Sequence, residues 1–358
     1  MARNKMTCIW ICVMLFCVCA TKETLSPWIN FTFDSLQDDY KITEKMPWWD
    51  AANFGCDFEK GILLPHNNIP QKLKSKMKAW KKYWVGALEV YTPWKWTEDK
   101  SSIFLAIGSL NVSGYEDTLN IINANDPYLC HKLCSNGNVG LQGRYCYCLR
   151  HKITPSVTHS GNIRCPGSFD QYCGDENSMT VYDVDAPQNL TFDHHNQPTC
   201  GYLYTETDDN DYIYKLTFTR NCENKFYYAC PKTALDSNNR ECDHNVCIST
   251  NKATWRHAMN TCKNKLFKLT TDVMKHLQTV ISNSNGWNWW SNTKLYWIGL
   301  TRNRKCKWIN GTDFAKDLLY YSERPSIQEC IAVYRTYSGH LRFIPKQCST
   351  ELRAFCQL

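Results

Sequence analysis

Beyond its first twenty residues the sequence lacks any long apolar run, and it also lacks the short motifs of common enzyme classes. It contains no HExxH zinc-protease motif, no nucleophile elbow and no phosphate-binding loop. No pair of acidic residues stands out as a general acid and base. A membrane-spanning helix needs about 20 consecutive apolar residues. We therefore expect a chain that has no membrane span and is not an enzyme.

A large excess of charge of one sign is also missing. The formal net charge of the 358 residues is +7 at pH 7. Nucleic-acid-binding domains usually carry a strongly basic face. The balance here is too mild to indicate a nucleic-acid partner, and we expect none.

The N-terminal apolar run has the form of a secretory signal. A basic head with Arg3 and Lys5 precedes an apolar stretch from Met6 to Ala20, where Val18 and Ala20 are small residues suited to cleavage. The stretch is too short to cross a bilayer comfortably. We predict that residues 1–20 are a signal peptide and that the mature chain is secreted and extracellular.

Cysteine, by contrast, is abundant. Four of the 21 cysteines lie in the predicted signal, so 17 remain. In a secreted chain cysteines form disulfides by default, and an odd number leaves at least one thiol over. Secretion also makes glycosylation at N-x-S/T sites an expectation. Four such sites occur, at Asn30, Asn111, Asn189 and Asn310.

A sequence pattern is repeated near the C-terminus and near the N-terminus. In the C-terminal copy Trp255, Ala258 and Cys262 fall at i, i+3 and i+7, which predicts one face of a helix. A buried strand, "LYWIGL", follows, and the copy closes with Cys330, Cys348 and Cys356.

In the N-terminal copy the same spacing is found at Trp49, Ala52 and Cys56, followed by "YWVGAL" at 83–88. The segment "KLKSKMKAWKKYW" between them predicts a second amphipathic helix that carries Trp80 on its apolar side. The closing cysteines are displaced to Cys200, Cys222 and Cys230, with the last pair again eight residues apart. The first copy is therefore split by an insertion of roughly 80 to 100 residues.

These residues resemble the C-type lectin-like domain family. The resemblance implies an α+β fold with two lectin-like domains, one from 26–108 joined to 185–232 and one over 238–358. It also implies a set of disulfides, each stabilising the fold by roughly 2–4 kcal/mol. The implied pairs are Cys56–Cys230, Cys200–Cys222, Cys242–Cys247, Cys262–Cys356 and Cys330–Cys348.

The insertion contains "CHKLC", "RYCYCLR" and "RCPGSFDQYCGD". This string resembles the WSC domain, a small cysteine-rich module often credited with glycan binding, and it places such a unit at 109–184. The family's G-C-Y opening and one further cysteine are absent here. Six cysteines are left, and we expect them to pair among themselves: Cys130, Cys134, Cys146, Cys148, Cys165 and Cys173.

One cysteine of the 17 then has no partner. This is Cys306, in "RNRKCKW". Two interpretations remain open. Cys306 is either an unpaired thiol of no consequence or the site of an interchain disulfide that makes a homodimer.

Sugar-binding members of the lectin-like family hold Ca²⁺ with a Glu-Pro-Asn or Gln-Pro-Asp triad and an Asn-Asp pair. Such oxygen ligands are what the ion requires. Here Arg324, Pro325 and Ser326 stand at the triad, and Ile344 and Pro345 stand at the pair before Cys348. The segment "LTFTRN" before Cys222 lacks the pair as well. We expect no calcium site, no other metal and no cofactor.

Candidate ligand-binding residues are tryptophans of a predicted loop and acids near the lost triad. They are Trp287, Trp289, Trp290, Glu323 and Glu329. The tryptophans are equally well explained as core residues. A further candidate is the lysine-rich segment 72–82, which could bind sulfated glycans or anionic lipids but is more simply a solvated helix face.

The sequence thus predicts a secreted recognition protein. We expect it to bind extracellular glycans or glycoproteins without calcium, through the WSC-like insert and the C-terminal domain, in innate immunity or cell adhesion. The alternative is a protein-interaction or adhesion module that keeps the lectin fold and has lost sugar binding.

Overall fold

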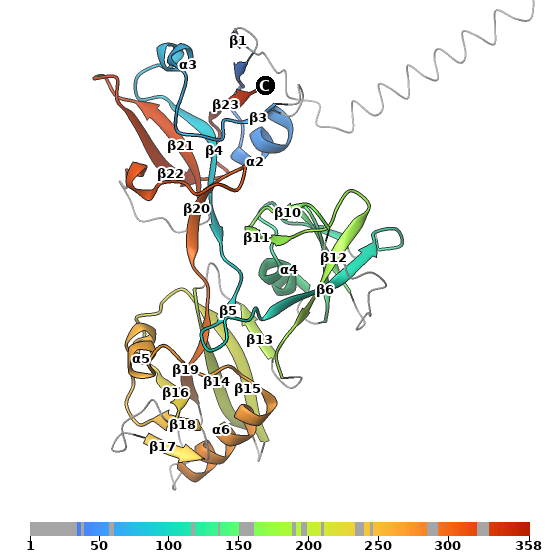
Figure 1. Ribbon diagram of the computed structural model, residues 1–358, viewed down its shortest axis with the longest axis vertical. Coiled ribbons are helices and arrows are strands. Elements are labelled where there is room, and N and C mark those ends of the chain that lie inside the picture. The colour runs from blue at the N-terminus through green and yellow to red at the C-terminus, as the bar shows by residue number, and fades with distance from the viewer. Residues whose placement is uncertain are drawn as a thin grey trace, which may run out of the picture. The chain divides into compact units, whose positions relative to one another are not determined.

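The protein is a mixed α+β chain made mostly of sheet, as the computed structural model in Figure 1 shows. The described residues are 34–36, 39–56, 61–115, 119–134, 137–149, 161–187, 191–194, 199–208, 211–232, 240–243, 246–284, 293–320 and 329–358. The predicted signal peptide at 1–20 lies outside them. No helix in this described part is long and apolar enough to cross a membrane.

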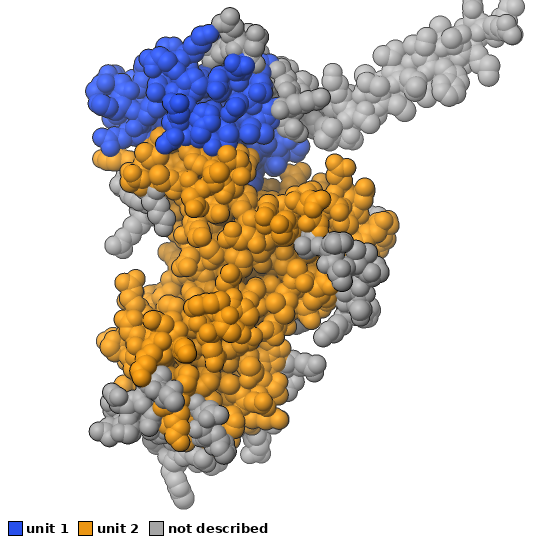
Figure 2. All heavy atoms as spheres, viewed as in Figure 1, with its two compact units in different colours: residues 1–86, 332–342, 348–358 blue, residues 87–331, 343–347 orange. Residues whose placement is uncertain are grey.

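The chain divides into two compact units (Figure 2). Unit 1 comprises residues 1–86, 332–342 and 348–358, and unit 2 comprises residues 87–331 and 343–347. The apolar core of unit 1 includes the fully buried Trp48, Trp84 and Phe355. In unit 2 one apolar cluster gathers rings from distant parts of the chain, among them Trp94 and Phe218.

The first sheet combines strands from both ends of the chain, in the order β1-β2-β23-β4-β21-β22, with β20 also paired to β4 and β3 to β23. Its strands are β1 (Asp34–Leu36), β2 (Tyr40–Ile42), β3 (Ile62–Leu63), β4 (Lys82–Tyr91), β20 (Arg304–Trp308), β21 (Glu329–Arg335), β22 (Leu341–Gln347) and β23 (Arg353–Gln357). The helical elements in the same parts of the chain are α2 (Trp48–Asp50), the π-helical η1 (Ala51–Gly55), α3 (Gln71–Lys76) and the 3₁₀ turn η5 (Lys316–Leu318).

The second sheet has the order β13-β15-β14-β19-β16-β18-β17, with β5 paired to β19. Its strands are β5 (Lys95–Trp96), β13 (Thr191–His194), β14 (Cys200–Asp208), β15 (Asp211–Thr219), β16 (Tyr227–Pro231), β17 (Arg240–Asp243), β18 (Val246–Ser249) and β19 (Lys294–Thr301). The helices α5 (Trp255–Thr261) and α6 (Thr271–Ser284) precede β19 in the chain.

The inserted segment forms its own five-stranded sheet, in the order β6-β12-β8-β9-β7, and a ribbon of β10 and β11. The elements are β6 (Phe104–Asn111), β7 (Leu119–Ile121), α4 (Pro127–Cys134), β8 (Val139–Gln142), β9 (Tyr145–Cys148), β10 (Arg164–Cys165), β11 (Ser168–Tyr172) and β12 (Ser178–Val184). Its six cysteines pair among themselves, as their even number predicts. The pairs are Cys130–Cys146, Cys134–Cys148 and Cys165–Cys173.

The two sequence copies make the same hydrogen bond between the helix and the W-x-G strand. In the first copy Trp48 Nε1 donates to Val85 O at 2.8 Å, and in the second Trp255 Nε1 donates to Ile298 O at 3.1 Å. Because a buried indole N–H needs an acceptor, this bond fixes where the helix lies on its strand. The repeat found in the sequence is therefore also a structural repeat.

The helix of the first copy differs from the expected register. Trp48 and Ala51 are buried, whereas Trp49 and Ala52, which the i, i+3, i+7 spacing selects, are only partly buried. The cause is the π-helical segment η1, which holds one residue more per turn than an α-helix and so places Cys56 eight residues after Trp48. The expectation that Trp49 fills the place of Trp255 is wrong.

The two copies exchange their second halves. Trp48 N, in the first copy, donates to Cys348 O of the second copy at 2.8 Å. Trp255 N, in the second copy, donates to Cys222 O of the first copy at 2.9 Å. Each helix therefore packs with the closing segment of the other copy.

The disulfides show the same exchange. Cys56 is bonded to Cys356, and Cys230 is bonded to Cys262. The predicted pairs Cys56–Cys230 and Cys262–Cys356 are wrong. Each copy ends in two cysteines eight residues apart, and so the sequence pattern could not choose between the two arrangements. The remaining pairs do not depend on the exchange: Cys200–Cys222 and Cys242–Cys247 are formed, and Cys330 and Cys348 are disulfide-bonded.

The exchange takes place where strand β4 continues toward β5 instead of turning back. Residues 87–91 of β4 pair antiparallel with β20, and β5 pairs with β19. Between them Thr92 N donates to Asn303 O, and Asn303 N donates to Thr92 Oγ1, both at 2.9 Å. Pro93 disfavours a helical or tightly turned conformation at Thr92 and so favours continuation of the strand.

Candidate functional site: an exposed aromatic platform

The lysine-rich segment of unit 1 forms a short helix and then a turn, not the longer helix that its pattern predicts. Helix α3 ends at Lys76, and Met77 is buried in an extended conformation. Lysines four residues apart, such as Lys74 and Lys78, repel one another on a helix. This repulsion and the strand-forming residues of β4 both disfavour a longer helix.

Trp80 consequently lies on the surface. The residue is 51% exposed, and its backbone has a φ of 62°, in the left-handed region that is strained for a bulky side chain. Such a conformation costs about 1–3 kcal/mol and persists only where surrounding structure holds it. Here Trp80 N donates to Arg335 O at 2.9 Å, which ties the turn to strand β21.

Two tyrosines of the β21–β22 hairpin complete a cluster of rings. The Trp80 and Tyr334 rings are stacked, with centroids 5.3 Å apart, and Tyr337 meets Trp80 edge-on at 5.9 Å. Tyr337 is 85% exposed. The hairpin is closed by Thr336 N, which donates to His340 O at 2.9 Å. We call Trp80, Tyr334 and Tyr337 the ring platform.

The ring platform has the chemistry of a binding surface. Flat rings bury much apolar area with little loss of conformational entropy, and exposed rings held by a strained backbone are typical of functional sites. The sequence pattern places Trp80 on the buried face of a helix and so does not indicate this site. The alternating lysines, which oppose a continuous helix, were the available signal.

Of the predicted ligand-binding residues, Trp287, Trp289, Trp290 and Glu323 lie outside the described residues, as does the segment 324–326 at the lost calcium triad. Glu329 is described, and it is buried at 6% exposure at the start of β21. Burial raises the pKa of its carboxyl group to about 7, although Arg304 and Lys346 act in the opposite direction. Its Oε2 has no hydrogen-bond partner among the described residues. A buried carboxyl group of this kind is poorly placed to contact a glycan at the surface.

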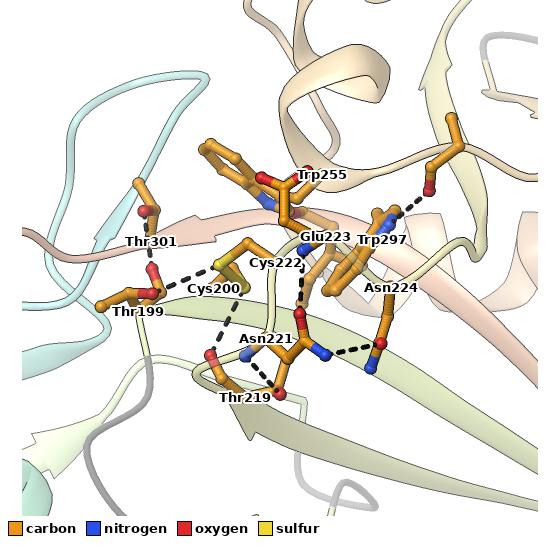
Figure 3. Close-up of a disulfide and its surroundings, with 12 residues drawn as sticks. Thr199, Cys200, Thr219, Asn221, Cys222, Glu223, Asn224, Trp255, Trp297 and Thr301 are labelled. Atoms are coloured by element: carbon orange, nitrogen blue, oxygen red, sulfur yellow. Dashed lines mark hydrogen bonds between the residues drawn. A yellow bond between two sulfur atoms is a disulfide. The ribbon is translucent and has the colours of Figure 1, made fainter. Parts of the chain in front are cut away.

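In the first copy, the Asn-Asp pair of calcium ligands would stand just before Cys222, which lies in unit 2 (Figure 3). The Cys200–Cys222 disulfide there is held by its neighbours: Thr199 Oγ1 lies 3.2 Å from Cys222 Sγ, and Thr301 Oγ1 donates to Thr199 O at 2.8 Å. Phe218, four residues before Cys222, is fully buried. The surroundings are those of a structural disulfide.

Ile344, at the pair position before Cys348, is buried and offers no oxygen ligand from its side chain. Among the described residues, one group of His, Cys, Asp or Glu side chains brings three ligand atoms together, namely Cys130, Cys134 and Cys146. All three belong to disulfides, so their sulfurs are not available as thiolates.

Arg302 fills an aromatic cage in unit 2, beside the exchanged strands. Its guanidinium carbon lies 3.9, 4.6 and 5.0 Å from the ring centroids of Tyr91, Tyr128 and Trp94. Its Nη1 lies 3.3 Å from Asp126 Oδ2, and both side chains are almost fully buried. Burial raises the pKa of Asp126, and the charge of Arg302 opposes that rise. The cage is already occupied by the guanidinium group of Arg302. It therefore has a structural role and is not a candidate ligand site.

Among the described residues Cys306 takes part in no disulfide, as the count predicts, and it lies buried in β20. A buried thiol can reach a second chain only if the strand opens, so this position does not favour the interchain disulfide. Two predicted glycosylation sites, Asn111 and Asn310, are exposed. The others, Asn30 and Asn189, lie outside the described residues.

Comparison with known proteins adds no assignment: no family model, no curated protein and no solved structure matches this chain.

Proposed function

We propose that this chain is a secreted recognition protein that binds extracellular glycans without calcium. The observation that carries the proposal is the ring platform. Trp80 and Tyr337 are both exposed, and the strained turn at Trp80 is held by a hydrogen bond to Arg335 O. An exposed indole offers the apolar C–H face of a sugar ring a flat surface of its own size.

The proposal includes the domain composition that the sequence suggests. It comprises two lectin-like domains, built from exchanged halves, and a WSC-like unit at 109–184. The matched bonds of Trp48 and Trp255 support the lectin-like repeat. The disulfides of the insert and the other bridges fit an extracellular, oxidising location.

Calcium is unnecessary in this mechanism because affinity comes from ring stacking and hydrogen bonds rather than from displaced water on a metal ion. Ile344 and Pro345, in place of oxygen ligands, support that view. The same reasoning separates the proposal from its alternative, a protein-interaction module. Such a module would also use exposed rings but would not recognise isolated sugars.

The test is a glycan array probed with the full chain, with and without a chelator. We expect signal on some glycans, unchanged by the chelator and weakened in the Trp80→Ala and Tyr337→Ala variants. Tyr320→Ala, which removes an exposed ring of unit 2, is the matched control and should bind as the parent does. The absence of signal on every glycan would favour the protein-interaction alternative, and a chelator-sensitive signal would contradict binding without calcium.

A further inference from the structure

The ring platform lies within a strongly basic part of unit 1. Residues 71–88 contain no acidic residue, and residues 331–350 contain none either. Lys78 and Lys81 flank Trp80 and are exposed, and Lys81 N donates to Lys78 O at 3.2 Å across the turn. The lysines of the first segment are Lys72, Lys74, Lys76, Lys78, Lys81 and Lys82.

The hairpin side of the platform is basic as well. Arg335 and Arg342 are on its two strands, and His340 is in the turn between them. The hydrogen bond from Trp80 N to Arg335 O joins the strand that carries Arg335 to the lysine turn. Arg335 Nε is buried and has no acceptor among the described residues. Exposed lysines thus flank the exposed Trp80 in the turn.

A solvated helix face does not account for this arrangement. The lysines next to Trp80 lie in a turn, not on a helix, and the same turn holds the tryptophan in a strained conformation. Like charges held close together repel, and this cost is offset when an anionic ligand binds between them. A neutral sugar would stack on the rings but would not neutralise the cations. A simple anion would neutralise the cations but would not stack on the rings.

We infer that the ring platform binds a sulfated glycan, whose sugar rings stack on Trp80 and Tyr337 while its sulfate groups are bound by Lys78, Lys81 and their neighbours. The inference rests on the proposed function and specifies its ligand class. Sulfated sugars carry both required features, flat apolar faces and fixed negative charges that lysine binds as a point charge. Their affinity depends on salt, because binding releases counterions from the polyanion.

The experiment measures binding of the full chain by calorimetry to three hexasaccharides: a heparin-derived one, its fully desulfated form and neutral chitohexaose. Each titration is run at several NaCl concentrations. Vesicles containing phosphatidylserine serve as a further probe. We expect tight binding to the heparin-derived hexasaccharide alone, with an affinity that falls steadily as salt increases.

Variants separate the roles of ring and charge. Trp80→Ala and Tyr337→Ala should each weaken binding by about tenfold, with an unchanged dependence on salt. Lys78→Gln with Lys81→Gln should weaken binding and lower the slope of log K against log salt by roughly two. Lys265→Gln with Lys275→Gln removes the same charge from exposed sites of unit 2 and should change neither quantity. Because Tyr337 is 85% exposed, its variant should fold normally even if Trp80→Ala does not.

Equal binding of the sulfated and desulfated sugars would overturn the inference while leaving glycan recognition in place. Failure to bind any of the sugars would overturn the inference, and, together with an empty glycan array, the proposed function as well. Binding to the vesicles that the heparin-derived sugar does not compete would identify a membrane surface as the ligand and would also overturn the inference.

Discussion

At the residue scale, the buried pair of Arg302 and Asp126 shows how a charge can be kept inside the protein. Three rings face the guanidinium group, and the carboxylate of Asp126 lies 3.3 Å from it. Removing one partner from such a pair leaves an uncompensated buried charge. Replacing both with apolar residues is often close to neutral.

Asp126→Ala should therefore lower the free energy of unfolding by about 3–5 kcal/mol, because Arg302 would be left buried without its counterion. The combined replacement Asp126→Leu with Arg302→Met should recover most of that loss. Urea unfolding followed by fluorescence measures both. A smaller loss of unfolding free energy in the single variant than in the combined one would show that Arg302 does not need Asp126 as its counterion.

Glu329 gives a prediction about pH. Its folded-state pKa is about 7, against 4.5 when unperturbed, so between these values the folded state holds a proton that the unfolded state has released. The unfolding free energy should consequently fall as the pH rises through this window. Glu329→Gln should be close to the parent in stability at pH 5 and more stable than the parent at pH 8. A stability difference that is equal at both pH values would argue against a raised pKa.

At the element scale, the π-helical segment η1 decides which tryptophan of the first helix is structural. It adds one residue before Cys56, so Trp48 rather than Trp49 bonds the strand at Val85. A spacing rule based on 3.6 residues per turn cannot anticipate that extra residue. The same rule was correct for Trp255, whose helix is regular.

Trp48→Phe should lower the unfolding free energy by about 1–3 kcal/mol, because the buried Val85 carbonyl would lose its donor. Trp49→Phe, at the neighbouring position and with the same change in chemistry, should cost less than about 0.5 kcal/mol. Paired urea titrations of the two variants compare these costs. A larger cost for Trp49→Phe than for Trp48→Phe would show that Trp49 is the structural tryptophan, as the sequence spacing implies.

At the scale of the whole molecule, the exchange of halves makes each set of packed elements depend on both copies of the repeat. The Cys56–Cys356 bridge spans 300 residues, and Cys230–Cys262 joins the end of one copy to the helix of the next. Both bridges cross the segment 233–239, which connects the copies. In the unexchanged arrangement no bridge would cross it.

A protease site placed within 233–239 tests the exchange directly. After cleavage the two fragments should migrate as one species without reductant and separate once reductant is added, because two disulfides still join them. The uncleaved chain provides the size reference. Two separate fragments without reductant would show that the copies close on themselves.

The sequence by itself determined the repeat and the six-cysteine insert, and counting left Cys306 outside the predicted disulfides; the α+β class followed from the family resemblance. These features depend on the spacing and the number of particular residues, above all cysteine, and both can be read without knowing the path of the chain in space. The ring platform could not be predicted from the sequence. The exposure of Trp80 depends on where the lysine-rich helix α3 ends and on a hairpin more than 250 residues away in the chain.

Only the tertiary structure decided which halves of the repeat belong together. Cys230 and Cys356 occupy equivalent positions, so either could meet Cys56 with the same local geometry. In the structure β4 pairs with β20 as far as Tyr91 and the chain continues past Thr92, which hydrogen-bonds to Asn303, so each helix meets the closing segment of the other copy. In a repeated sequence each residue has two equivalent possible partners. Which partner it contacts depends on the path of the chain between the copies.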